Sequence, residues 1–128
     1  MGFKLLVIDD EKDLLDFLTR VLTDAGYEVR TAVNGPEGLT LAQQDPPDLV
    51  LLDIMMPRMD GWEVLRILKS LPRVSHIPVV MLTAKADPQS RWDGWQEGAV
   101  DYITKPFTLE DLKLRLDEIL AQVGEKRE

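Results

Sequence analysis

Five short apolar segments, separated by longer amphipathic ones, are the strongest constraint on how this chain of 128 residues folds. This alternation is typical of βα units, in which each strand is followed by a helix that packs on a parallel sheet. The first segment is apolar at odd and even positions alike, which predicts a strand covered by helices on both faces. The expected strands are residues 3–8, 28–32, 48–53, 78–82 and 100–104.

Turn-forming residues mark the limits of five expected helices. Gly26 follows the first, Gly35-Pro36 begins the second, and Pro72 follows the third. A fourth comes after Asp87-Pro88 and ends at Gly98. The fifth begins with a capping-box-like pair, Thr108 and Asp111, and buries a stripe made of Leu109, Leu112, Leu116, Ile119, Leu120 and Val123.

Five βα units favour an α/β fold, a flavodoxin-like doubly wound five-stranded parallel sheet in the order 2-1-3-4-5 with five helices. Ligands of such sheets bind outside the carboxyl ends of strands 1 and 3, where the strand order reverses. We expect one domain over residues 1–124 and a short charged tail, or the start of a linker, at 125–128.

Composition narrows the class of protein. The net charge of −8 argues against a nucleic-acid surface on this domain. No apolar stretch approaches the roughly 20 residues of a membrane helix, so we expect no membrane contact. The absence of cysteine agrees with a reducing compartment, and we expect a cytoplasmic location.

Polar residues stand where four of the expected strands end. Asp9 and Asp10 follow the first strand, Asp53 ends the third, Thr83 follows the fourth and Lys105 follows the fifth. In a parallel sheet these ends lie along one edge, so three carboxylates, a hydroxyl and an ammonium group should meet there. Clustered carboxylates need a cation, and Mg²⁺ prefers oxygen ligands. Asp53 could then attack a phosphoryl group as a carboxylate nucleophile.

The motifs around these positions resemble the receiver domain of two-component response regulators. The resemblance covers essentially the whole chain, with every motif in order: Ile8-Asp9-Asp10-Glu11, Leu52-Asp53-Ile54-Met55-Met56-Pro57, Met59-Asp60-Gly61, Leu82-Thr83-Ala84 and Tyr102-Ile103-Thr104-Lys105-Pro106-Phe107. It implies a phosphorylation-activated switch that catalyses its own magnesium-dependent phosphorylation and dephosphorylation without being a turnover enzyme.

The resemblance also implies a role for each site residue. Asp53 would accept the phosphoryl group from a histidine kinase or phosphotransfer protein. Asp10 would bind Mg²⁺ directly, Asp9 largely through water, and Met55 through its backbone carbonyl. Thr83 and Lys105 would stabilise the phosphoryl group.

Thr83 and Tyr102 would form a switch pair that remodels the face built from the fourth helix, the fifth strand and the fifth helix. An output domain or partner protein would bind that face. The same face could also form a homodimer on phosphorylation, through positions that match Arg91, Asp101, Asp111 and Arg115.

Several residues also have simpler interpretations. Asp9 or Asp10 is expected to cap the first helix as well. Tyr102 could be ordinary half-buried core, because aromatic residues are common in strands. Trp92 and Trp95 could pack against the sheet or form an exposed partner site. Trp62 is expected to pack in the core or at a helix start. The lone histidine, His76, is expected to be structural or solvated rather than a catalytic base, because it lies at the sheet edge away from the carboxylates.

Three rival functions compete with this interpretation, the first of them on the same fold. A flavin mononucleotide carrier would need a phosphate-binding loop rich in Gly, Ser or Thr after strand 1, where this chain has acidic residues. An aspartyl phosphatase typically has two aspartates flanking one residue there, whereas Asp9 and Asp10 are adjacent. A receiver-like scaffold that is never phosphorylated usually lacks one of the acidic, threonine or lysine positions, and all are present here.

Overall fold

A computed structural model describes residues 2–84 and 98–127 of the chain. Five strands form one parallel sheet in the order β2-β1-β3-β4-β5, which confirms the expected topology. The strands are β1 (Lys4–Ile8), β2 (Glu28–Ala32), β3 (Leu49–Asp53), β4 (Val79–Thr83) and β5 (Asp101–Thr104). Each lies within one residue of its predicted bounds.

Four helices are described, namely α1 (Lys12–Asp24), α2 (Gly35–Gln44), α3 (Gly61–Ser70) and α5 (Leu109–Arg127). The helix predicted between Asp87-Pro88 and Gly98 lies outside the described residues, as do the positions of Arg91, Trp92 and Trp95. Helix α5 extends to Arg127, into the segment 125–128 that was expected as a short charged tail or the start of a linker.

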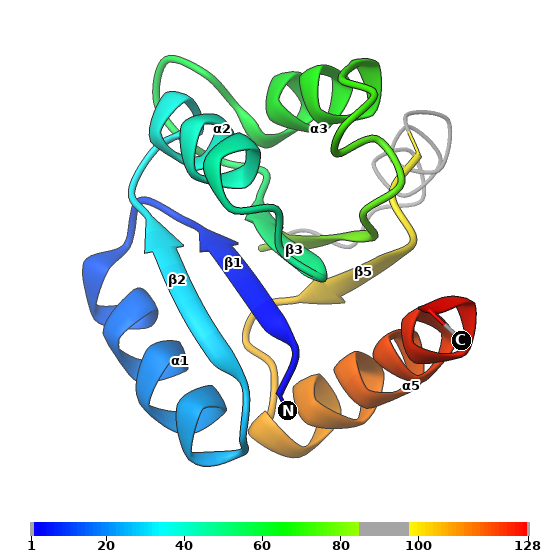
Figure 1. The fold of residues 1–128 in the computed structure, drawn as a ribbon. Coiled ribbons are helices and arrows are strands. Elements are labelled where there is room, and N and C mark those ends of the chain that lie inside the picture. The colour runs from blue at the N-terminus through cyan, green and yellow to red at the C-terminus, as the bar shows by residue number, and fades with distance from the viewer. Residues whose placement is uncertain (1, 85–97, 128) are drawn as a thin grey trace.

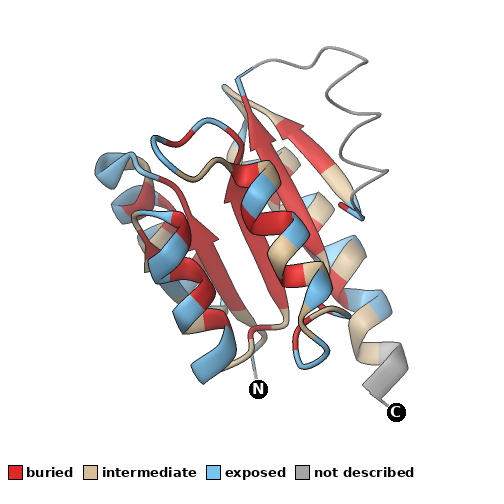
Figure 2. Ribbon diagram, turned by 90° about the horizontal axis from the view of Figure 1, so that it is seen from above, coloured by how far each residue is buried: buried red, intermediate tan, exposed pale blue. Residues whose placement is uncertain are grey.

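The helices form two layers that cover opposite faces of the sheet. Helices α1 and α5 lie on one face, and α2 and α3 lie on the other (Figure 1). The central strands β3 and β4 are buried at every position, and the helices expose only their outer faces (Figure 2). This is why β3 and β4 read as uninterrupted apolar runs rather than as alternating ones.

Local sequence signals explain where the helices begin and end. Gly26 has φ +100° after α1, and Tyr27 N–H donates to the carbonyl of Leu22 at 3.1 Å, closing a Schellman motif. Asn34 and Asp60 cap α2 and α3 through their side-chain oxygens. The Thr108 hydroxyl accepts the Asp111 N–H at 3.0 Å, as the capping pair predicts.

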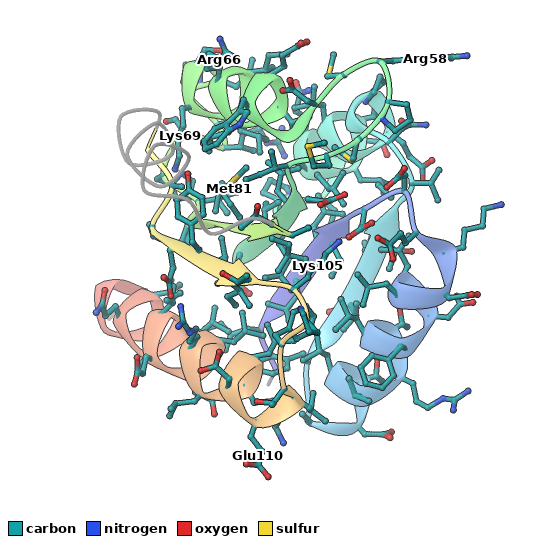
Figure 3. The ribbon with its side chains drawn as sticks, turned by 180° about the vertical axis from the view of Figure 1, so that it is seen from behind. Arg58, Arg66, Lys69, Met81, Lys105 and Glu110 are labelled. Carbon is teal, nitrogen blue, oxygen red and sulfur yellow. The ribbon has the colours of Figure 1, made fainter. Side chains whose placement is uncertain are left out.

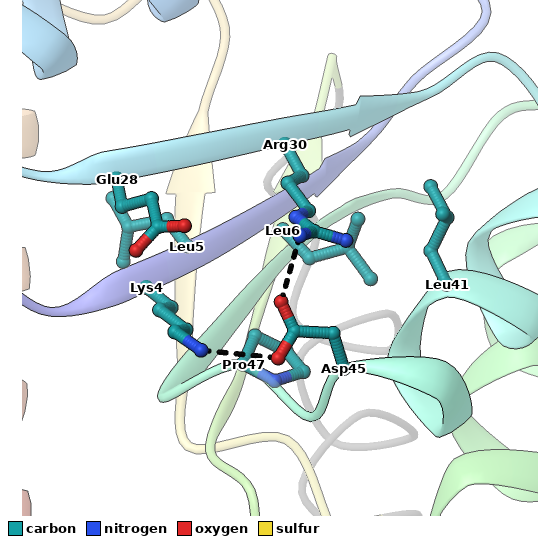
Figure 4. Close-up of a pocket in the computed structure, with 8 residues that line it drawn as sticks. All are labelled: Lys4, Leu5, Leu6, Glu28, Arg30, Leu41, Asp45 and Pro47. Atoms are coloured by element: carbon teal, nitrogen blue, oxygen red, sulfur yellow. Dashed lines mark hydrogen bonds and ion pairs between the residues drawn. The ribbon is translucent and has the colours of Figure 1, made fainter.

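The edge strand β2 carries charged residues on its exposed side, which discourages pairing with another chain. Asp45, after α2, accepts from Lys4 Nζ at 3.0 Å and lies 2.9 Å from the guanidinium of Arg30 (Figure 4). The hydrogen bond from Lys4 holds the pKa of Asp45 below its ordinary value. The cavity beside this cluster measures only about 10 Å³, so we regard the cluster as structural.

Candidate functional site

The predicted polar residues meet at the carboxyl edge of the sheet. Asp9 follows β1, Asp53 ends β3 and Thr83 ends β4, and their exposed fractions are 0%, 3% and 3%. Asp10 is exposed at the rim. One carboxylate oxygen from each of Asp9, Asp10 and Asp53 lies within 4.8 Å of the other two. The three carboxylates therefore lie together, as expected from the strand ends.

Lys105 reaches into this group of carboxylates from the loop after β5 (Figure 3). Its Nζ lies 2.9 Å from Asp9 Oδ2 and 3.4 Å from Asp53 Oδ1. Its backbone N–H donates to the carbonyl of Thr83 at 2.7 Å, so β4 positions the start of the loop. The side chain is only 18% exposed, which makes it the cation that offsets two buried carboxylates.

The pKa values follow from this burial and charge. Burial raises the pKa of Asp53 to about 6, and the charge of Asp9 adds to the effect. Lys105 and a hydrogen bond from the Met55 backbone N–H act in the opposite direction. For Lys105, burial alone lowers the pKa, but the hydrogen bond and charge of Asp9 and the charges of Asp53 and Glu11 raise it overall.

Asp9 is held from two sides. Its Oδ1 accepts the Glu11 N–H at 2.9 Å and its Oδ2 accepts from Lys105. The expectation that Asp9 or Asp10 caps α1 is wrong, because Glu11 is the N-cap and makes no side-chain cap bond. Asp9 instead turns the chain between β1 and α1. Its occupied oxygens fit the expected role of a ligand that acts through water.

The three carboxylates fit a magnesium ion by their chemistry. Two carboxylates within 4.8 Å repel by at least roughly 3 kcal/mol at an effective dielectric of 20. One ammonium group cannot neutralise three such charges. Magnesium prefers oxygen ligands, and in proteins it commonly binds one or two carboxylates together with phosphate oxygens. Asp10 and Asp53, with the backbone carbonyl of Met55, are the residues that would hold it.

Two further residues shape the site, although neither was assigned a role from its place in the receiver-like motifs. Glu11 adds a fourth carboxylate, with Oε1 3.6 Å from Lys105 Nζ. Gly61 packs on the end of β3, because a Cβ there would lie 2.3 Å from the Asp53 carbonyl oxygen. The contact of Glu11 with Lys105 could have been predicted, because Glu11 follows Asp10 directly in the sequence. The packing of Gly61 on β3 could not, because it depends on how the loop 54–60 folds back.

The remaining predicted residues lie away from the carboxylates. Tyr102 is 3% exposed and therefore buried rather than half-buried. Trp62 lies at the start of α3 and packs on the core, as expected. His76 is exposed and lines a cavity of about 500 Å³ at the opposite edge of the sheet, with Pro47, Asp48 and Pro78. Within the described ranges, no helix is long and apolar enough to cross a bilayer.

Asp101, Asp111 and Arg115 lie together on β5 and α5. The guanidinium of Arg115 contacts the Asp101 carboxylate at 3.1 Å and the Asp111 carboxylate at 3.3 Å. It also donates to the carbonyl of Tyr102 at 2.8 Å. These side chains are thus paired within one chain, and Arg91, the fourth residue of the predicted dimer face, lies outside the described residues.

Comparisons with known proteins identify relatives of this arrangement. The family model described as the response regulator receiver domain matches residues 5–117. The DNA-binding dual master transcriptional regulator RpaA of Synechocystis sp. is 42% identical over 119 residues, which cover 93% of this chain and 49% of RpaA. The response regulator PleD of Caulobacter vibrioides is 42% identical over 93% of this chain and 28% of its own length.

Solved structures agree with the sequence relatives. The chemotaxis protein CheY4 of Vibrio cholerae has a TM-score of 0.89 and 33% identity, covering 93% of this chain and 99% of that one. A CheY-like receiver domain protein from Methanospirillum hungatei has a TM-score of 0.91 and 29% identity, over 98% and 99% of the two chains. The chain spans about half or less of the length of RpaA and PleD, and nearly all of the two structural neighbours.

Proposed function

The chain belongs to the response regulator receiver domain family, and from this premise we propose that Asp53 accepts a phosphoryl group in a magnesium-dependent reaction. The donor would be a histidine kinase or a phosphotransfer protein. The observation that carries the proposal is the buried Asp53 carboxylate, held beside Asp9 and Lys105 at the carboxyl edge of the sheet. The family assignment favours this function over flavin binding or phosphatase activity.

The chemistry requires Asp53 to be ionised and aimed at the donor. One of its oxygens would bond to phosphorus while the bond from phosphorus to the donor's histidine nitrogen breaks, and the departing imidazole takes up a proton. Lys105 would pair with a phosphoryl oxygen, and the Thr83 hydroxyl would donate a hydrogen bond to another. A bound magnesium ion supplies the positive charge that lets two anions approach. The phosphoryl group would remain covalently bound to Asp53, which is the behaviour expected of a switch rather than of an enzyme that releases its product.

Magnesium dependence gives the direct test of this proposal. Incubation with acetyl phosphate, a small phosphodonor, should add one phosphoryl group per chain when Mg²⁺ is present. Removal of the metal with a chelator should reduce labelling by roughly 100-fold, because the repulsion between phosphate and carboxylates is then unscreened. Intact-mass spectrometry and release of the label by hydroxylamine would identify an acyl phosphate. Equal labelling with and without the metal would contradict the proposal.

The output surface of the proposed switch is the face that includes β5 and α5. Phosphorylation would remodel it for an output domain, a partner protein or a second copy of the chain. Dimerisation through Asp101, Asp111 and Arg115 must exchange their contacts within the chain for contacts between chains. Exposed ion pairs contribute only ~0.2–1 kcal/mol each, so the exchange would produce a weak and readily regulated dimer.

Sedimentation velocity tests the dimer. Beryllofluoride, which mimics a phosphoryl group on a carboxylate, should shift the native protein towards a dimer. Arg115→Ala should weaken that dimer by roughly two- to fivefold, because one residue serves two carboxylates. Arg20→Ala, which removes an exposed arginine of α1, is the matched control and should have no effect. A native profile unchanged by beryllofluoride would exclude phosphorylation-promoted dimerisation.

A further inference from the structure

The ring of Tyr102 lies against the indole of Trp62. The ring centroids are 6.2 Å apart with an interplanar angle of 50°, a tilted arrangement that aromatic pairs favour. Tyr102 comes from β5 and is buried, while Trp62 comes from the first turn of α3 and is partly buried. Both belong to the apolar layer between the sheet and α3. The indole therefore stabilises the buried position of the Tyr102 ring.

The start of α3 is also tied to the phosphoacceptor. Gly61, the residue before Trp62, donates its N–H to the carbonyl of Ile54 at 2.9 Å. A side chain at Gly61 would meet the Asp53 carbonyl, so the helix backbone lies directly on the end of β3. One turn of helix thus contacts the backbone of Asp53 on one side and the ring of Tyr102 on the other.

We propose that Trp62 is a positioning residue that holds Tyr102 in its buried position and links that position to the state of Asp53. The inference rests on the proposed function and on the switch pair that the family resemblance implies, in which the Tyr102 ring turns inward on phosphorylation. This connection runs through α3 and is separate from the one through Thr83 on β4. Because coupling between two sites is reciprocal, loss of the indole should weaken binding of a phosphoryl mimic at Asp53.

The experiment compares native protein with Trp62→Leu, which keeps an apolar side chain and removes the ring. Beryllofluoride affinity in the presence of Mg²⁺ should fall roughly two- to tenfold, the range expected from losing one aromatic pair. With 3-fluorotyrosine incorporated, the chain gives two ¹⁹F signals, from Tyr27 and Tyr102, and Tyr27→Phe assigns them. The Tyr102 signal should become sensitive to replacing H₂O with D₂O only in the variant.

Control variants separate positioning from general loss of packing. Ile67→Ala removes partly buried apolar surface from the same helix and should leave both readouts at native values. Trp62→Phe retains an aromatic ring and should restore most of the affinity. If Trp62→Leu fails to fold, Trp62→Met, whose flexible side chain fills irregular space, should show the same loss.

The outcomes distinguish this inference from the proposed function. If native protein binds beryllofluoride and Trp62→Leu binds it equally well with a buried Tyr102 signal, Trp62 has no positioning role. An equal loss in Ile67→Ala would also overturn the inference, because the effect would then be general. Failure of the native protein to bind beryllofluoride at all would instead refute phosphorylation at Asp53.

Discussion

Replacing Asp53 with asparagine is expected to abolish labelling by acetyl phosphate and, at the same time, to stabilise the metal-free protein. The amide has no nucleophilic oxygen of carboxylate character, so the acyl phosphate cannot form. The stability gain follows from the cost of keeping a charged Asp53 buried beside Asp9. A pKa shift from 3.8 to about 6 corresponds to roughly 3 kcal/mol at neutral pH, and we expect a measured gain of about 1–3 kcal/mol.

The sign of this effect predicts a pH dependence. The folded state holds a proton on Asp53 up to pH about 6, whereas the unfolded chain releases it near 3.8. Protonation of Asp53 therefore stabilises the folded state fully below pH 3.8, and this contribution is lost as the pH rises through about 6. Metal-free native protein should lose stability over this window relative to Asp53→Asn, and Mg²⁺ should restore stability only to the native protein.

Urea unfolding between pH 4 and 8, with and without Mg²⁺, measures both effects. Asp48→Asn is the matched control because it changes an aspartate at the other end of the same strand. Its Oδ2 accepts the Lys4 backbone N–H at 2.7 Å, a bond that an asparagine carbonyl can keep. This control should be labelled normally and gain no stability. If the free energies of unfolding of native protein and Asp53→Asn vary with pH in the same way, burial does not destabilise the charged form of Asp53.

Replacing Lys105 with methionine should have the second largest effect. Methionine keeps the apolar stem and removes the only cation that lies within 3.4 Å of the buried Asp53 carboxylate among the described residues. Leaving buried charges without their partner costs about 3–5 kcal/mol of stability at neutral pH. Labelling by acetyl phosphate should slow roughly 100-fold, because a charged donor to the phosphoryl oxygens is lost.

The pH dependence of Lys105→Met provides a second readout. The charge and hydrogen bond of Lys105 both lower the pKa of Asp53, so their loss should raise it beyond its native value. The variant should therefore regain stability as the pH falls towards 5. Lys12→Met, which removes an exposed lysine at the start of α1, is the control and should unfold like native protein. Equal stability of native protein and Lys105→Met at neutral pH would contradict the proposed charge balance.

The fold was predictable because each of its signals is local. Apolar runs, spacings of three and four residues, and turn residues such as Gly26 act within a few positions of the chain. The same locality explains one error. The acidic pair after β1 was expected to include a helix cap, but Glu11 is the N-cap and Asp9 accepts its N–H instead.

Residue patterns were sufficient to predict the sheet order and the edge at which Asp9, Asp10, Asp53 and Lys105 meet. Parallel strands with right-handed connections leave no other common edge for residues that end successive strands. The three-dimensional contacts were needed to establish which oxygens Lys105 contacts, how strongly burial raises the pKa of Asp53, and that Trp62 lies against Tyr102. These depend on distances of a few ångströms between segments distant in the chain, and residue patterns carry no such distances.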